Sequence, residues 1–171
     1  MNFSELVHAR YSVRSYKSDP IPDDILETIL EAGRVAPSAH NSQPQMIYVA
    51  KTEESRRKIA DVCPCTFGAP MILVIAYDQN RQRMSRLNPG YGFGENDTAI
   101  VCTQMMLQAT DLGIGSCWIG MFKREDISAV LELPENITVI GLLLLGYAAD
   151  DAQPLPLHTQ YRDHTETIAY I

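Results

Sequence analysis

Two long apolar runs dominate the order of hydrophobic and polar positions along the chain. Residues 69–77 and 137–147 contain no charged side chain and are rich in Ile, Leu and Val. Uninterrupted apolar runs of this length are typical of strands that are covered on both faces. The pattern therefore predicts two central strands, and residues 45–50 predict a shorter one.

Helical spacing of apolar residues marks five further segments. Acidic residues stand near the start of most of them, where the helix dipole favours negative charge. We expect helices near residues 3–7, 23–33, 53–62, 97–111 and 123–133. Gly33 is expected to end the second helix and Pro134 the last. The fourth carries mostly small and apolar residues with little charge, which indicates a helix buried on more than one side.

Two stretches lie outside this pattern. The polar residues 78–95 are interpreted as a mobile flap whose apolar contacts are limited to Tyr91 and Phe93. In the tail, alternation over Thr167–Ile171 predicts an edge strand, either in its own sheet or lent to a partner subunit. No repeat or linker separates a second domain, so residues 1–171 are expected to form a single domain.

Composition and charge narrow the function classes. With 46% hydrophobic and 20% charged residues, the chain has the composition of an ordinary globular protein. Its net charge of -7 argues against nucleic acid or an acidic membrane as partner, so any anion site must be local. No run reaches the roughly 18 apolar residues of a membrane span, and no signal sequence is recognised at the start, so a cytoplasmic location is expected.

Four cysteines raise the question of a disulfide or a metal site. In the cytosol the thiols are expected to stay reduced. Cys63 and Cys65 are closer in sequence than the usual zinc-binding pair, and Cys102 and Cys117 lie far away on elements expected to be buried. Structural zinc is therefore the weaker alternative.

The first candidate site is the segment Arg10–Arg14. In an extended chain, Arg10, Ser12 and Arg14 point to the same side, because alternate residues share a face. Two guanidinium groups and a hydroxyl supply the donors that a phosphate group needs. The alternative is a solvated edge segment without a ligand.

The second candidate is the polar segment Ala36–Pro44, which contains a proline near each end. Because these prolines prevent a helix from continuing, the segment either connects two elements or presents Ser38, Asn41 and Gln43 to a ligand. His40 in the same segment is either a general acid or simply exposed.

The third candidate is the glycine-rich stretch Leu112–Phe122, which follows the apolar helix. Glycine has no Cβ, so Gly113, Gly115 and Gly120 allow the backbone to approach a flat cofactor closely. The alternative is that Gly113 only ends the helix and that the following residues form a core strand.

Taken together and in this order, the three segments resemble the FMN-dependent nitroreductase family. The resemblance covers the chain from about Leu6 to its end. It implies an α+β fold in which a central, mainly antiparallel or mixed sheet is flanked by helices. It also implies an intertwined homodimer that has the long apolar helix in its interface and one FMN in each of two sites between the subunits.

The resemblance assigns roles to individual residues. Arg10, Ser12 and Arg162 are expected to hold the FMN phosphate, and Arg14 to lie near the pyrimidine edge, where a fixed cation favours the reduced flavin. Pro37, Ser38, Ala39 and Asn41 of the other subunit are expected against the ribityl chain and ring. Ile114 and Gly115 are expected to cover the ring and to offer backbone N–H groups to N5 and O4. The remaining predicted FMN contacts are Tyr11 and Gln43.

The implied activity is ping-pong transfer of hydride from NADH or NADPH, through FMN, to a nitroaromatic, a quinone or an activated alkene. No residue stands out as an obligatory acid or base, which suits a reaction carried by the flavin. Two features depart from longer family members: residues 78–95 are short, and Arg162 stands alone where a basic pair is common. The alternatives are a flavin storage or sensor protein without efficient turnover, and a metal-binding domain without flavin.

Overall fold

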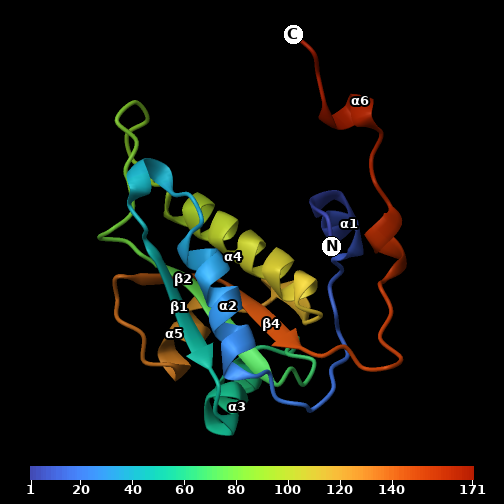
Figure 1. The fold of residues 1–171 in the computed structure, drawn as a ribbon. Coiled ribbons are helices and arrows are strands. Elements are labelled where there is room, and N and C mark those ends of the chain that lie inside the picture. Colours follow the sequence, from blue (N-terminus) through green and yellow to red (C-terminus); the bar gives the residue numbers. More distant parts are fainter.

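A computed structural model describes all residues 1–171 and shows a four-stranded antiparallel sheet between two layers of helices (Figure 1). The strand order is β1-β2-β4-β3. The elements in chain order are α1 (Phe3–Ala9), α2 (Asp23–Arg34), the 3₁₀ turn η1 (Ala39–Asn41), β1 (Gln45–Ala50), α3 (Glu53–Val62), β2 (Met71–Asp78), α4 (Gly94–Asp111), β3 (Gly115–Ile119), α5 (Arg124–Val130), β4 (Ile137–Gly146), the 3₁₀ turn η2 (Pro156–Thr159) and α6 (His164–Thr167). The predicted α+β class with a mainly antiparallel central sheet is confirmed.

Strand β2 shows why its sequence is apolar without interruption. Leu73 and Ile75 point into a core that α2 and α4 close, with Ile29 and Met105 among the side chains from these helices. The intervening residues of β2 point into a second core that α3 and α5 close. Because successive strand residues face opposite sides, a strand between two helical layers must be apolar at every position.

Glycine decides how closely the helices pack. A Cβ on Gly33 would lie 2.9 Å from Met105 Cγ, so the missing side chain lets α2 approach α4. The prediction that Gly33 ends α2 was therefore wrong, because the helix continues through Arg34 and is capped by Val35. Gly94 similarly lies over the Tyr77 ring, which allows α4 to start before the expected Asp97.

Residues 78–93 are a short hairpin rather than a connection without structure. Met84 pairs with Gly92, and the Ser85 N–H donates to the Tyr91 carbonyl at 2.8 Å. The Tyr91 and Phe93 rings pack edge to face with centroids 5.0 Å apart. The two expected aromatic residues therefore contact one another, and we call this hairpin the arm.

The tail corrects another expectation. Residues 148–171 leave the sheet after β4 and run beside α1, away from any strand edge (Figure 1). Residues 164–167 form the short helix α6, and no strand follows, so the predicted edge strand is absent within this chain. Lending of the tail to a partner stays a prediction. None of the helices combines the length and the apolar character that crossing a membrane requires.

Candidate cofactor site

The segment Arg10–Arg14 lies along the edge strand β3. Ser12 forms a parallel bridge with Ser116, and the Val13 N–H donates to the Ser116 carbonyl at 2.9 Å. A Cβ on Gly115 would lie 2.8 Å from Val13 Cγ2, so this close approach requires glycine. The first and third candidate segments, more than 100 residues apart, are thus in contact.

The hydroxyl of Tyr16 fixes the same segment from within. It donates to the Val13 carbonyl at 2.8 Å, and burial raises the pKa of this hydroxyl far above its ordinary value. Tyr16 therefore stays neutral at any physiological pH and acts as a hydrogen-bond donor. Its contact holds the backbone between Arg10 and Arg14 in place.

A cavity of about 320 Å³ opens over these residues. The side chains that line it are Arg10, Tyr11, Ser12, Arg14, Leu155, Leu157, His158 and Tyr161. None of them is acidic, and neither arginine takes part in any ion pair of the structure. In a chain of net charge -7, a pocket with two unpaired guanidinium groups fits a phosphate ligand.

A second cavity of about 160 Å³ shares the lining residue Tyr11 with the first. Its lining includes the glycine stretch from Gly113 to Ser116. Gly113 has a φ of +75° and ends α4, so the helix-cap interpretation is confirmed, as is the strand that follows. The same backbone also lines the cavity, and the buried Ser116 hydroxyl has no partner. These features fit a flat ligand that the backbone contacts directly.

Only part of the tail lines the cationic cavity beside Arg10–Arg14. Residues 155–161 return to the Arg10–Arg14 segment, where the His158 ring packs against Tyr11 with centroids 6.2 Å apart. Arg162 follows directly, is exposed and makes no ion pair, but it does not line the cavity. The role predicted for Arg162 therefore stays a prediction.

The second candidate segment is held in an uncommon backbone conformation. His40, Asn41 and Gln43 have φ values of 59°, 54° and 46°. Such left-handed angles outside glycine cost of order 1 kcal/mol each and persist only where the surroundings hold them. Here the Ala39 N–H donates to Asp97 Oδ1 at 2.9 Å, and the Gln43 N–H donates to Ser38 Oγ at 3.0 Å.

Asp97 is the residue of this site that sequence analysis missed. It lies in the first turn of α4, is 3% exposed, and is the one buried acidic side chain of the protein. In the sequence, an acidic residue at the start of a helix indicates only a favourable interaction with the helix dipole. The contact with Ala39 could not be predicted, because the two residues are 58 positions apart in the chain. The neighbouring Pro37, Asn41 and Gln43 are exposed, which leaves them free to contact a ligand.

The two parts of the predicted site lie at opposite ends of α4. Asp97 holds the Pro37–Gln43 loop at the start of the helix, and Gly113 begins the glycine stretch just after its end. An α-helix rises 1.5 Å per residue, so these 18 residues separate the two parts by about 27 Å. One chain therefore brings Arg10, Ser12, Arg14, Ile114 and Gly115 together, and leaves the loop elsewhere.

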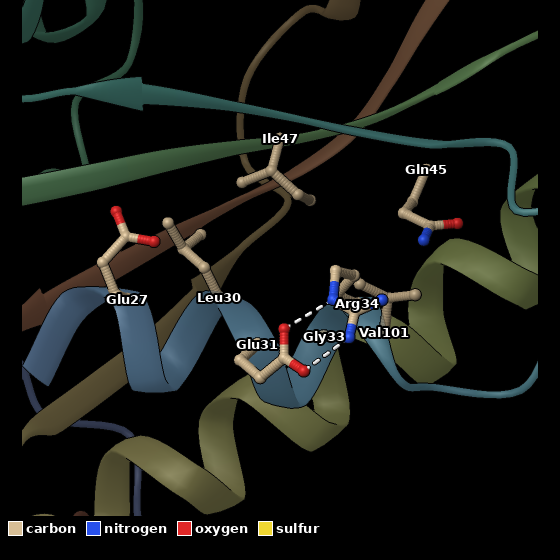
Figure 2. A pocket seen from close by; sticks show the side chains of 8 residues that line it. All are labelled: Glu27, Leu30, Glu31, Gly33, Arg34, Gln45, Ile47 and Val101. Atoms are coloured by element: carbon tan, nitrogen blue, oxygen red, sulfur yellow. Dashed lines mark hydrogen bonds and ion pairs between the residues drawn. The ribbon is translucent and has the colours of Figure 1, made fainter. Parts of the chain in front are cut away.

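A pocket of another character lies between α2, α4 and β1 (Figure 2). Its volume is also about 320 Å³, and its polar rim includes Glu27, Glu31 and Arg34. The Arg34 guanidinium donates twice to the Glu31 carboxylate, at 2.5 and 2.6 Å, as the dashed lines show. No predicted FMN contact lines this pocket, and its only cation is already neutralised. It does not fit a phosphate.

The four cysteines are free thiols. Burial raises the pKa of Cys63, Cys102 and Cys117 above the ordinary thiol value. The structure groups no three His, Cys, Asp or Glu side chains around a point where a metal ion would bind. Cys117 lies beside the Ser12–Ser116 bridge, where its protonated thiol acts as a small apolar side chain.

Comparison with known proteins identifies the family. The sequence pattern described as Nitroreductase family matches residues 7–67 and 63–147. The chain belongs to the nitroreductase family. The expected family and the expected class of enzyme, an oxidoreductase, are therefore confirmed.

Relatives within this family span most of the chain. A nitroreductase family protein from Clostridium difficile 630 is 32% identical, with a TM-score of 0.93 over 99% of this chain and 98% of that one. A Bacillus subtilis protein named FMN reductase (NAD(P)H) is 27% identical over 91% of this chain and 70% of its own length. An FMN-dependent nitroreductase from Clostridium difficile R20291, 24% identical with a TM-score of 0.77 over 96% of each chain, shares the fold.

Proposed function

We propose that this nitroreductase-family protein is an FMN-dependent oxidoreductase that uses NADH or NADPH and works as a homodimer. The observation that carries the proposal is a pair of cavities, one cationic and one lined by glycine backbone, which share Tyr11 and lie beside the Ser12–Ser116 bridge. Together they match the two ends of FMN, which has an anionic phosphate and a flat ring. The similarity to relatives named for FMN and NAD(P)H supports the same conclusion.

In this proposal Arg10 and Ser12 bind the phosphate, and Arg162 of the tail joins them. The Arg10 guanidinium has no anionic partner within the chain, and a phosphate dianion supplies one. Arg14 lies at the pyrimidine edge of the ring, where its charge favours electron uptake. Ile114 and Gly115 contact the ring through the backbone that lines the second cavity. The Ile114 N–H is not a free donor to the flavin, because it already donates to the Ala109 carbonyl at 2.8 Å.

The chemistry that bound FMN supplies is hydride uptake from NAD(P)H and electron transfer to an acceptor. No carboxylate lines either cavity, so the chain contributes binding, orientation and positive charge. We propose a nitroaromatic compound, a quinone or an activated alkene as the acceptor class. These acceptors share a flat, electron-poor group that can lie on the same open face as the nicotinamide ring.

The homodimer is proposed because one chain holds only part of the site. Two copies that pack their α4 helices antiparallel about a two-fold axis place the loop of one beside the glycine stretch of the other. Pro37, Ser38, Ala39, Asn41 and Gln43 would then contact the FMN of the partner.

Exposed apolar surface supports this arrangement. Helix α1 has no buried residue, and its Phe3 is 71% exposed. Ile100 on α4 is 41% exposed, and Leu157 and Tyr170 in the tail are 72% and 97% exposed. Apolar surface of this extent is typical of a face that a partner covers. Of these segments, α4 is the one that the resemblance places in the subunit interface.

The visible absorption spectrum of the purified protein tests the proposal. We expect a flavin spectrum, or uptake of added FMN, that bleaches when NADH or NADPH is added without oxygen. Bound FMN that neither nucleotide reduces would favour the storage or sensor alternative. A colourless protein that takes up no FMN would refute the cofactor, and a monomer that binds FMN fully would refute the shared site.

A further inference from the structure

The arm, residues 78–93, carries more positive than negative charge. It includes Arg81, Arg83 and Arg86, and its one acidic residue is Asp78. Arg81 is paired, since its Nε lies 3.7 Å from Asp78 Oδ2. Arg83 and Arg86 take part in no ion pair, and their guanidinium groups make no hydrogen bond to the protein. In an acidic protein, two free guanidinium groups on one hairpin favour an anionic ligand.

The arm is held in a defined shape, so these arginines have a defined place. The Phe93 N–H donates to the Arg83 carbonyl at 2.9 Å, and Ser85 Oγ accepts from the Asn88 N–H at 3.0 Å. At its base, Gln82 Oε1 accepts from the Gly94 N–H at 3.2 Å, which ties the arm to the start of α4. Arg83 is half-buried in this framework, and Arg86 is exposed.

The arm lies beside the Pro37–Gln43 loop (Figure 1). The Asp78 N–H at the start of the arm donates to the Pro44 carbonyl at 2.9 Å. Asp97, which holds Ala39, follows the end of the arm in the first turn of α4. If the loop contacts FMN in the proposed dimer, the arm lies near the same site, because its two ends are bonded beside the loop.

We propose that Arg83 and Arg86 bind the 2′-phosphate of NADPH and so make NADPH the preferred reductant. The inference rests on the proposed function, which brings NAD(P)H to the face of the flavin beside the arm. NADPH and NADH differ only in this phosphate, which is a dianion at neutral pH and matches two guanidinium groups. The Tyr91 ring, which is 44% exposed on the same arm, offers a flat face on which an adenine can stack.

The test compares the double variant Arg83→Ala/Arg86→Ala with the matched control Arg81→Ala, whose guanidinium is engaged by Asp78. Steady-state kcat/KM is measured for NADPH and for NADH with an uncharged quinone as acceptor. Binding of adenosine 2′,5′-bisphosphate and of adenosine 5′-monophosphate is measured by calorimetry, which does not depend on turnover. FMN content is recorded for every variant.

We expect the double variant to lose about tenfold or more in kcat/KM for NADPH, little for NADH, and to lose the preference for the bisphosphate. The Arg81→Ala control should keep both. Equal losses for the two nucleotides, or the same loss in Arg81→Ala, would overturn the inference while leaving a working flavin enzyme. A protein that holds no FMN but still prefers the bisphosphate through Arg83 and Arg86 would refute the proposed function and retain the nucleotide site.

Discussion

The two ends of α4 hold different kinds of binding surface. At its C-terminal end, Gly113 and Gly115 bring bare backbone beside the guanidinium groups of Arg10 and Arg14. At its N-terminal end, the buried Asp97 holds a polar loop in a strained conformation, with the arm beside it. The surfaces that fit the phosphate and the ring of FMN lie at the C-terminal end, whereas the loop expected against the ribityl chain lies at the other. This difference is the reason for proposing a dimer whose sites each draw on both chains.

The largest expected effect on FMN binding comes from substitutions at the two ends of α4, one end in each chain of a mixed dimer. Arg10→Glu places a negative charge in the phosphate pocket, and Asn41→Asp with Gln43→Glu places negative charge on the exposed loop without changing its shape. Each variant alone should lose FMN. Heterodimers isolated with two different affinity tags should regain about half of the FMN of the wild type, because one of two sites is intact.

Recovery is the decisive result, because it requires that each site draws on both chains. If each site were built within one chain, every site of the mixed dimer would carry a defect. The heterodimer would then remain as empty as its parents. Circular dichroism of each parent controls for folding, since all the altered side chains are exposed or line an open cavity.

A smaller effect is expected when Arg10 is shortened. Arg10→Ala removes a charge-assisted contact and should weaken FMN binding by about 1.5–3 kcal/mol, measured by fluorescence titration. The matched control is Arg34→Ala in the pocket of Figure 2, because the Arg34 guanidinium is already bound by Glu31. Equal affinities of the two variants would place the phosphate elsewhere.

The N-terminal end is tested through Asp97. Asp97→Ala leaves the Ala39 N–H without an acceptor and should lower the free energy of unfolding by about 1–3 kcal/mol in urea denaturation. FMN affinity should fall as well, because the left-handed residues of the loop lose their support. Asp97→Asn keeps an acceptor oxygen and should retain most of the affinity.

The control for Asp97 is Glu95→Ala in the same turn of α4. Glu95 pairs with Arg124 on the surface and does not contact the loop. Exposed pairs contribute little, so this change should cost less than about 1 kcal/mol and leave FMN binding unchanged. If both variants lost FMN equally, the charge of the helix end rather than the loop contact would explain the effect.

The smallest effect concerns two buried thiols, Cys102 in the middle of α4 and Cys117 in β3. Burial raises the pKa of Cys102 and Cys117 in the folded chain. Their contribution to stability is therefore complete below the ordinary thiol pKa and is lost as the pH rises above it. For Cys102, about 1 kcal/mol of unfolding free energy should be lost between pH 8.5 and 9.5, because only its unfolded thiol ionises there, and the loss for Cys117 has the same sign.

Denaturation at several pH values measures this loss. Cys102→Ala should remove the share of Cys102 from the pH dependence, and Cys117→Ser should remove that of Cys117. Cys117→Ser should also leave turnover largely intact, since the neutral thiol has no assigned chemistry. A folded, FMN-loaded but inactive Cys117→Ser variant would show that the thiol has a role in the reaction.

The helices and strands of the fold were predictable because their apolar residues recur at regular spacing. The apolar runs of β2 and β4 and the spacing of α2 report local burial, which each segment carries in its own sequence. The three candidate segments were visible for the same reason, since glycine, proline and paired arginines restrict or charge the chain locally. Gly33 could not be interpreted in this way, because its role is to leave room for Met105 of another helix.

What the amino-acid sequence determined by itself is the helices and strands of the two-layered core, the family and the residue types of the site, but not the tail, where α6 stands in place of the predicted strand. What only the tertiary structure decided is which of these residues meet. It placed Ser12 against Ser116, tied Ala39 to Asp97, returned residues 155–161 to Arg10, and separated the loop from the glycine stretch by the length of α4. The physical reason is that side-chain patterns encode burial, whereas contacts between distant segments arise only when the cores close around a common sheet.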